Sequence, residues 1–129
     1  MKVAFTSSTG EIIDQHFGQC QNFHIWELAA DQAAEIDVIS GITTEGDEED
    51  RISARANALA GCAIVYTMQI GGPAAAKLVA RKIHPMKTNT EVPVAEIVTK
   101  LQEVLSGNPP PWLKKAMNQQ PAGSFLDED

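Results

Sequence analysis

The sequence predicts an α/β domain in which helices cover both faces of a mixed β-sheet. Three observations support this fold class. Residues 1–42 are typical of short strands separated by turns, residues 62–68 (CAIVYTM) form the continuous apolar run of a buried parallel strand, and apolar residues recur at helical spacing in three later segments. A hairpin that leads into βα units indicates a three-layer domain.

Strands and turns are predicted for the first third of the chain. The segments are a strand at 2–6 (KVAFT), extended residues at 11–13, a loop at 14–21, and a hairpin of strands 22–29 and 34–42. The strand at 22–29 alternates, with Phe23 and Ile25 on one face and His24 and Trp26 on the other. The polar, acidic residues 43–50 then connect the hairpin to the first helix.

Three helices and two further strands follow. In chain order they are a helix at 49–60, a strand at 62–68, a helix at 73–82, a short extended piece at 83–88, and a helix at 93–107. Acids in the first turn and Gly61 just past the end suit the first helix. Pro73 stands at the first position of the second helix. The segment NPPPWLKKAM adds a short helical turn.

Length and composition indicate one globular domain. The 129 residues are 43% hydrophobic and 21% charged, and we expect a folded domain at 1–117 and a disordered acidic tail at 118–129. No apolar run reaches the roughly 20 residues needed to cross a membrane, and the N-terminus lacks a secretory signal. We therefore expect a cytoplasmic protein without a membrane partner, in which both cysteines are reduced.

The net charge of −7 is unevenly distributed. Residues 1–50 contain eleven acids and one lysine, whereas residues 51–90 contain six basic residues and no acid. An acidic chain lacks the dominant basic face of general nucleic-acid binders, so no nucleic-acid partner is expected. The basic middle segment either binds a compact anion or covers the solvated faces of helices.

The loop IDQHFGQC, residues 13–20, contains the first candidate site. A loop histidine such as His16 presents an imidazole nitrogen to a transition metal, and Asp14 could orient that ring. Gly18 allows a sharp turn and close approach of a ligand, Phe17 anchors the loop in the core, and Cys20 could supply a thiolate. The alternative is a structural turn with Cys20 as a small apolar residue.

The second candidate site is IGGPAAAK, directly after the 62–68 strand. Ligands gather where strand C-termini meet helix N-termini, and Gly71 and Gly72 would let an anion approach free backbone N–H groups. The alternative is an ordinary βα connection. The sequence KIHPMK places His84 and Lys87 nearby, and with Lys77 and Arg81 they form a small basic group. His84 and Cys62 have structural readings as well, as a satisfied histidine and a packed thiol.

Catalytic motifs are missing. GxSxG, HExxH and CxxC do not occur, and most acids lie in polar connections and in the tail rather than at strand ends. We therefore predict that the chain is not an enzyme.

Three segments in this order resemble the dinitrogenase iron–molybdenum cofactor-binding family. They are DQHFGQCQNFHIWE, IVYTMQIGGPAAAKLVARKIHPMK and LQEVLSGNPPPWLKK, and the match covers about residues 1–117. It is best to the NifX members, with the NafY core domain and the C-terminal domain of NifB as relatives. The resemblance implies a ribonuclease H-like α/β fold with a mixed five-stranded sheet and without nuclease activity.

The resemblance also implies a function and a set of site residues. It implies a carrier that binds iron–sulfur precursors of the nitrogenase cofactor, such as the NifB product, and passes them to the NifEN scaffold. The histidine of the family's D-x-HFG loop falls on His16, which becomes the leading iron ligand. Gly18, Gly71, Gly72 and Lys87 are candidate cluster contacts, and the candidate secondary ligands are Cys20, Cys62 and His84.

Two other readings stay open. The first is a protein-interaction module that docks on nitrogenase assembly partners, with NPPPWL as a contact, and carries no cluster. The second is a degenerate phosphotransfer or nuclease enzyme. Because so few side-chain ligands are available, a homodimer sharing one cluster is also considered.

Overall fold

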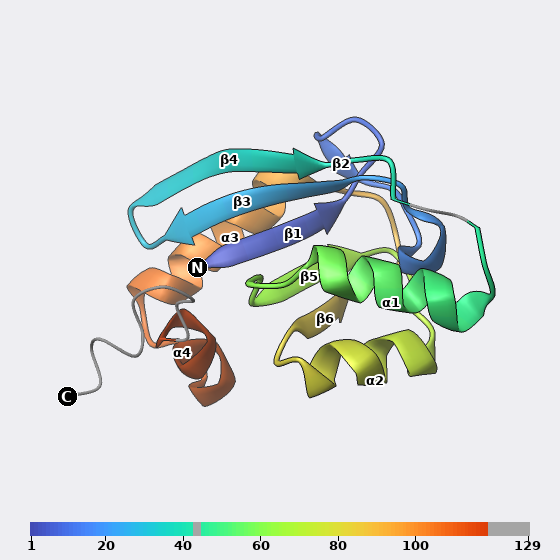
Figure 1. The fold of residues 1–129 in the computed structure, drawn as a ribbon. Helices are drawn as coiled ribbons and strands as arrows, with labels where there is room; N and C mark the ends of the chain where they lie inside the picture. Colours follow the sequence, from blue (N-terminus) through green and yellow to red (C-terminus); the bar gives the residue numbers. More distant parts are fainter. Residues whose placement is uncertain (43–44, 119–129) are drawn as a thin grey trace.

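A computed structural model describes residues 1–42 and 45–118. Its elements in chain order are β1 Lys2–Thr6, β2 Ile12–Ile13, the 3₁₀ helix η1 Phe17–Gln19, β3 Phe23–Ala29, β4 Gln32–Ile39, α1 Glu48–Ala58, β5 Ile64–Thr67, α2 Gly72–Ala80, β6 His84–Lys87, β7 Val92–Pro93, α3 Val94–Ser106 and α4 Pro111–Asn118. Figure 1 shows these elements coloured along the chain.

Five strands form one mixed sheet in the order β4-β3-β1-β5-β6. The hairpin strands pair antiparallel with each other and with β1, whereas β1, β5 and β6 run parallel. The predicted α/β class with a mixed five-stranded sheet is therefore confirmed. Because β5 and β6 are parallel, the loops that follow them meet at one edge of the sheet, as do the loops that precede them at the other.

Two apolar cores separate three layers, with α1 and α2 over one face of the sheet and α3 over the other (Figure 1). Successive residues of a strand enter opposite cores: Ala4 and Val65 pack with α1 and α2, whereas Phe5 and Tyr66 pack with α3. The predicted alternation along β3 is confirmed, since Phe23 and Ile25 lie in the first core and Trp26 packs against the second.

Helix ends follow the sequence closely. Asp47 caps α1 and accepts a hydrogen bond from the backbone N–H of Asp50 at 2.8 Å, while the side chain of Asp50 accepts in return from the N–H of Asp47. Gly71 is the N-cap of α2, with Pro73 in its first turn. Gly107 ends α3, as predicted.

Two elements differ from the prediction. The extended residues at 11–13 do not join the main sheet, because Ile12 and Ile13 pair antiparallel with the unpredicted strand β7. The helical turn expected in NPPPWLKKAM is the eight-residue helix α4, which packs Leu113 into the second core. No helix within the described ranges is both long and apolar enough to cross a membrane. Apart from Asn118, the predicted tail lies outside the described residues.

Candidate functional site

The loop at 14–20 runs along the C-terminal end of β5 and is fixed there by its backbone. The N–H of Met68 donates to the carbonyl of Gln15 at 3.0 Å, and the N–H of Phe17 donates to the carbonyl of Gln69 at 2.8 Å. Phe17 itself is fully buried in the first core, as predicted. Two backbone hydrogen bonds to residues 68 and 69 and the buried Phe17 ring therefore fix the loop in place.

The segment after β6 joins the same edge. The N–H of Asn89 donates to the carbonyl of Met68 at 3.1 Å, and the side-chain amide of Gln69 donates to Asn89 Oδ1 at 3.1 Å. Lys87, the last residue of β6, pairs with Thr67 in the sheet and is exposed. Three segments thus meet at one edge of the sheet: 14–20, 68–72 and 87–89. We call this the loop edge.

His16 stands at the surface of the loop edge. It is exposed, and its ring has no hydrogen-bond or ion-pair partner within the described residues. Its backbone is engaged, because the carbonyl of His16 accepts hydrogen bonds from the N–H groups of Gln19 at 3.1 Å and Cys20 at 3.0 Å. A fixed backbone with an unengaged imidazole leaves both ring nitrogens available to a ligand from outside the chain.

Asp14 does not orient His16, contrary to the sequence-based interpretation. Its two carboxylate oxygens accept hydrogen bonds from the backbone N–H of Ser8 at 2.9 Å and from the hydroxyl of Ser8 at 2.5 Å. Burial by itself would raise the pKa of Asp14, but the hydrogen bonds from Ser8 outweigh it and lower that pKa. Asp14 therefore closes the turn before the loop instead of supporting the imidazole.

Cys20 lies below the loop, inside the first core. Its side chain is fully buried and its thiol contacts the carbonyl oxygen of Phe17 at 3.2 Å. Burial raises the pKa of the Cys20 thiol to about 11, although the charge of Arg55 lowers it in part. A neutral, enclosed thiol is not presented to a metal in this conformation, so the structure favours the reading of Cys20 as a small apolar residue.

Arg55 is a residue of this site that sequence reasoning missed. It projects from α1, is fully buried, and donates from Nη2 to the carbonyl oxygen of Cys20 at 2.6 Å. This contact ties the end of the loop to the helix layer. A single arginine within an amphipathic helix is usually a surface residue, so the sequence carries no signal for this role.

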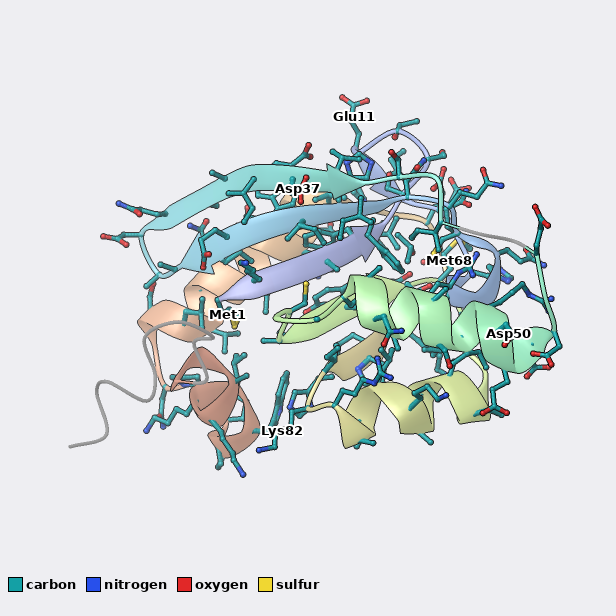
Figure 2. The ribbon with its side chains drawn as sticks, viewed as in Figure 1. Met1, Glu11, Asp37, Asp50, Met68 and Lys82 are labelled. Atoms are coloured by element: carbon teal, nitrogen blue, oxygen red, sulfur yellow. The ribbon has the colours of Figure 1, made fainter. Side chains whose placement is uncertain are left out.

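Cys62 and His84 lie at the opposite edge of the sheet. Cys62 precedes β5 and is buried, and this burial raises its thiol pKa to about 11. His84 begins β6 beside Ile64, and its ring packs against that of Trp112 at a centroid distance of 4.6 Å. Figure 2 labels Met68 and Lys82, which mark the two edges. The structure thus separates Cys62 and His84 from His16.

The glycines of the loop edge face open space. A Cβ atom added at Gly18 or Gly72 would meet no atom within 4 Å, and one at Gly71 would meet only Pro73 Cδ at 3.9 Å. None of the three has a positive φ. Gly18 is therefore not required for a sharp turn, contrary to the sequence-based interpretation. What these glycines provide is surface that no side chain covers.

The basic group predicted around His84 is divided. Lys77 turns toward α1, where its Nζ donates to Ser53 Oγ at 2.9 Å, and Arg81 lies at the far end of α2, where its Nη1 donates to Asn57 Oδ1. Lys87 alone among the four predicted members belongs to the loop edge. A hollow of about 360 Å³ between the starts of the two helices is lined by Glu48, Glu49, Ile52, Pro73 and Lys77. Its two carboxylates disfavour an anion there.

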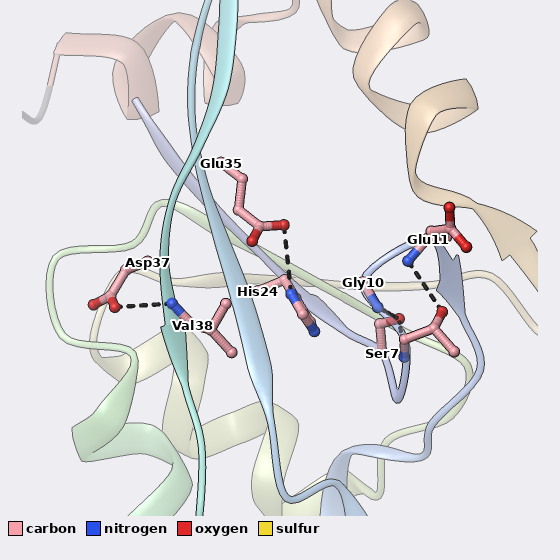
Figure 3. A network of polar contacts seen from close by, with 8 residues as sticks. Ser7, Gly10, Glu11, His24, Glu35, Asp37 and Val38 are labelled. Carbon is pink, nitrogen blue, oxygen red and sulfur yellow. Dashed lines mark hydrogen bonds and ion pairs between the residues drawn. The ribbon is translucent and has the colours of Figure 1, made fainter.

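The third histidine, His24, is part of the packing of the hairpin. It is buried, with Nδ1 3.4 Å from Glu35 Oε1, and the backbone of Gly10 lies against its ring (Figure 3). Gly10 has a φ of +90° and a Cβ there would come within 2.9 Å of the ring. His24 is therefore held inside the fold, in contrast to His16.

No group of three or more His, Cys, Asp or Glu side chains that could hold a metal ion occurs within residues 1–42 and 45–118. The loop edge offers one imidazole, uncovered backbone and one lysine. That set cannot form a closed four-ligand site, but it can contact an object that brings its own ligands.

Comparison with known proteins identifies the family. The model of the family described as "Dinitrogenase iron-molybdenum cofactor" matches residues 1–104. The chain belongs to this dinitrogenase iron–molybdenum cofactor family. It is 40% identical to NifX of Herbaspirillum seropedicae over 92% of this chain and 83% of that protein. It is also 41% identical to NifY of Azotobacter vinelandii over 94% of this chain, which spans about half, 50%, of that longer protein.

A solved structure supports the fold of this family member. The crystal structure of PH0822 is similar with a TM-score of 0.64 over 80% of this chain and 91% of that one, at 16% identity. Membership of the iron–molybdenum cofactor family and the NifX and NifY relatives together give the chain a role in nitrogenase cofactor biosynthesis.

Proposed function

We propose that the protein is a carrier that binds iron–sulfur precursors of the nitrogenase cofactor at the loop edge and passes them to the NifEN scaffold. The observation that carries this proposal is the exposed, unengaged ring of His16 on a loop whose backbone is fixed to β5. The proposed cargo is a preformed cluster such as the NifB product, and the donor and acceptor partners are NifB and NifEN.

The small number of ligands supports transient binding. An iron–sulfur cluster that is held permanently is normally bound by four cysteine thiolates. Here both cysteines are buried, and their thiol pKa values of about 11 leave them protonated at neutral pH. One imidazole from His16 therefore provides the direct bond to iron, which is a grip that a scaffold with more ligands can overcome.

Charge and shape at the loop edge support an anionic cargo. Gly71 is the N-cap of α2 and Gly72 is its first residue, where N–H groups of the first turn have no acceptor inside the helix and the helix dipole is positive. Pro73 contributes no N–H, so this site is weaker than a full helix start. The exposed ammonium of Lys87 adds a positive charge at the same edge. Open space at Gly18 and Gly72 leaves room for a bulky cluster.

The experiment is anaerobic titration of the apo-protein with the isolated NifB product, followed by desalting and iron analysis of the protein fraction. We expect the wild type to retain the cluster, and His16→Ala to retain at least about tenfold less, the equivalent of about 1.4 kcal/mol. His84→Ala is the matched comparison, because it removes a histidine from the opposite edge. Equal retention by His16→Ala and the wild type would overturn the proposed site.

Transfer is tested separately. Protein loaded with cluster is mixed with apo-NifEN and the two are separated by size. The carrier proposal predicts that iron moves to the NifEN fraction, and the mass of the loaded protein tests whether two copies share one cluster. If iron binds but never transfers, the protein stores rather than delivers.

The competing function is the protein-interaction module. The burial of both thiols favours this alternative, because that burial leaves His16 as the sole imidazole or thiol ligand at the loop edge. Under that reading the chain would bind assembly partners while taking up no iron. The titration above distinguishes the two, because the module predicts no iron on the wild-type protein.

A further inference from the structure

A second pocket lies at the edge of the sheet opposite the loop edge. It has a volume of about 170 Å³ and sits between the C-terminal end of α2, the start of β6 and α4; we call it the Trp112 pocket, and it is lined by Val79, Lys82, His84, Trp112, Lys115 and Ala116. The rings of His84 and Trp112 contact each other at 4.6 Å and 48°. The cluster-binding proposal makes no use of these residues.

The surroundings of this pocket are basic in a chain that is acidic overall. Residues 78–86 and 107–118, which supply the end of α2, the start of β6 and α4, contain three lysines and one arginine but no acid. Arg81 and Lys114 stand beside Lys82 and Lys115 in the sequence, and all four are exposed. Against a net charge of −7, this concentration of positive charge favours the approach of an acidic partner to this edge.

The pocket is suited to a single side chain. Sites for small-molecule ligands usually measure about 300–1,000 Å³, which is well above this pocket. Its lining includes Trp112 and Val79, and Val79 is 59% exposed. Aromatic anchors surrounded by a polar rim are typical of protein–protein contacts. The dimensions therefore favour a protein segment with one apolar anchor.

Lys82 is held in a costly backbone conformation. Its φ is 63°, in the left-handed region, at the position after α2 where glycine is the usual residue. A lysine there places an ammonium group at the rim of the pocket although a glycine would suit the backbone better. This strain suggests that the side chain is present for contact rather than for folding.

We propose that the Trp112 pocket docks an acidic segment of a partner protein. One apolar side chain of that segment enters between Val79 and the Trp112 ring, and its carboxylates pair with Lys82 and Lys115. The proposal stands independently of cluster binding, because the pocket and the loop edge share no residue and lie at opposite ends of the parallel strands.

The probe is a fluorescein-labelled octapeptide that carries four Asp or Glu residues around one Phe, titrated with the full chain and followed by fluorescence anisotropy. We expect a Kd below about 1 mM that weakens with added salt. Two reference peptides separate the contributions: one has Ala in place of Phe, and the other has Lys in place of the acids. Both should bind at least about fivefold more weakly.

Variants of the chain locate the binding. Lys82→Gly removes the charge while suiting the backbone, and should weaken binding about two- to fivefold. Trp112→Ala should weaken it at least about tenfold. Lys100→Gln is the matched control, because it also removes one positive charge but lies on the exposed face of α3 outside the pocket, and it should bind like the wild type.

Several outcomes would overturn the proposal. They are a wild type that fails to bind the peptide up to about 1 mM, a Lys82→Gly variant that binds as the wild type does, and an Ala peptide that matches the Phe peptide. Tighter binding of a labelled oligothymidylate than of the acidic peptide would show that the basic surface serves nucleic acid instead. Lys82→Gly relieves backbone strain and should therefore fold, so it tests the proposal even if Trp112→Ala does not fold.

Discussion

Substituting the open glycines of the loop edge should separate stability from cluster uptake. Gly18 lies in η1 and Gly72 begins α2, neither has a positive φ, and a Cβ at either position would meet no atom within 4 Å. Alanine thus meets no packing conflict at either place, although at Gly72 its Cβ would precede Pro73, which disfavours the helical backbone there. It also reduces the conformational freedom of the unfolded chain, which favours the folded state.

The expected gain follows from that entropy. Gly18→Ala should raise the free energy of unfolding by about 0.4–1 kcal/mol, or Tm by roughly 2–5 °C for a domain of this size, whereas Gly72→Ala should gain less because its Cβ precedes Pro73. Because Gly18 lies in η1 and Gly72 in α2, and a Cβ at either place would contact no other residue within 4 Å apart from its chain neighbours, their effects should add. Gly10→Ala is the contrasting control: its φ is +90° and its Cβ would lie 2.9 Å from His24 Cε1, so it should lose at least about 1 kcal/mol.

The cluster should respond in the opposite direction. If it rests on the uncovered backbone at these positions, each methyl group will hold it away from the N–H groups of α2 or from His16. We expect both variants to retain at least about fivefold less cluster in the anaerobic titration, near 1 kcal/mol. Urea unfolding gives the stability and iron analysis gives the uptake.

Two results would refute this reasoning. Loss of stability in Gly18→Ala would mean that the surface at this position is not open. Gain of stability with unchanged uptake would mean that the cluster does not touch these glycines, and the open surface would then need another explanation.

The buried ionisable groups yield two further predictions. Burial raises the thiol pKa values of Cys20 and Cys62 to about 11, above the usual 9, so the stability these groups contribute is complete below pH 9 and is lost as pH rises through 11. Urea unfolding from pH 8 to 11 should show that decline in stability, and Tyr66, whose pKa burial raises to about 12, adds to it. Cys20→Ala should make stability depend less steeply on pH. An unchanged pH dependence would contradict the role given to the buried Cys20 thiol. Arg55→Ala should lower the free energy of unfolding by about 3 kcal/mol, because it leaves the carbonyl of Cys20 without its charged donor and opens a cavity. The control Arg81→Ala, at an exposed position, should change it by no more than about 0.5 kcal/mol. Similar urea midpoints for the two variants would show that Arg55 does not anchor the loop.

Local patterns were enough to predict most of the fold. Three local patterns predicted elements that the structure contains. They are the apolar run at 62–68, the alternation from Phe23 to Trp26, and the positions of glycine and proline around α2. The short strand β7 escaped prediction because two residues have no periodicity. Its pairing with Ile12 and Ile13 depends on contacts across the chain, which a local pattern does not contain.

The site was only partly predictable, since proximity depends on which edge of the sheet a residue reaches. His16, Gly71 and Lys87 share an edge because each follows or adjoins the C-terminal end of a parallel strand. His84 is the first residue of β6 and Lys87 is the last. Although only three positions separate them in the sequence, they therefore lie at opposite edges of the sheet. Burial was the other missing quantity, because nothing local distinguishes the enclosed thiol of Cys20 from an exposed ligand.

The division of the sheet into two edges bears on how a carrier could work. β6 begins at His84, which lines the pocket, and ends at Lys87, which belongs to the loop edge, and these three residue steps span roughly 10 Å of extended chain. Cargo at the loop edge and a partner segment at the Trp112 pocket would thus lie at opposite ends of this strand and share no residue. A partner held at the pocket leaves the loop edge open, so an acceptor can approach the cluster while the carrier stays bound. Since the five-stranded sheet between them is rigidly packed on both faces, we infer little coupling between the two sites, and docking would raise the local concentration of cargo rather than its affinity.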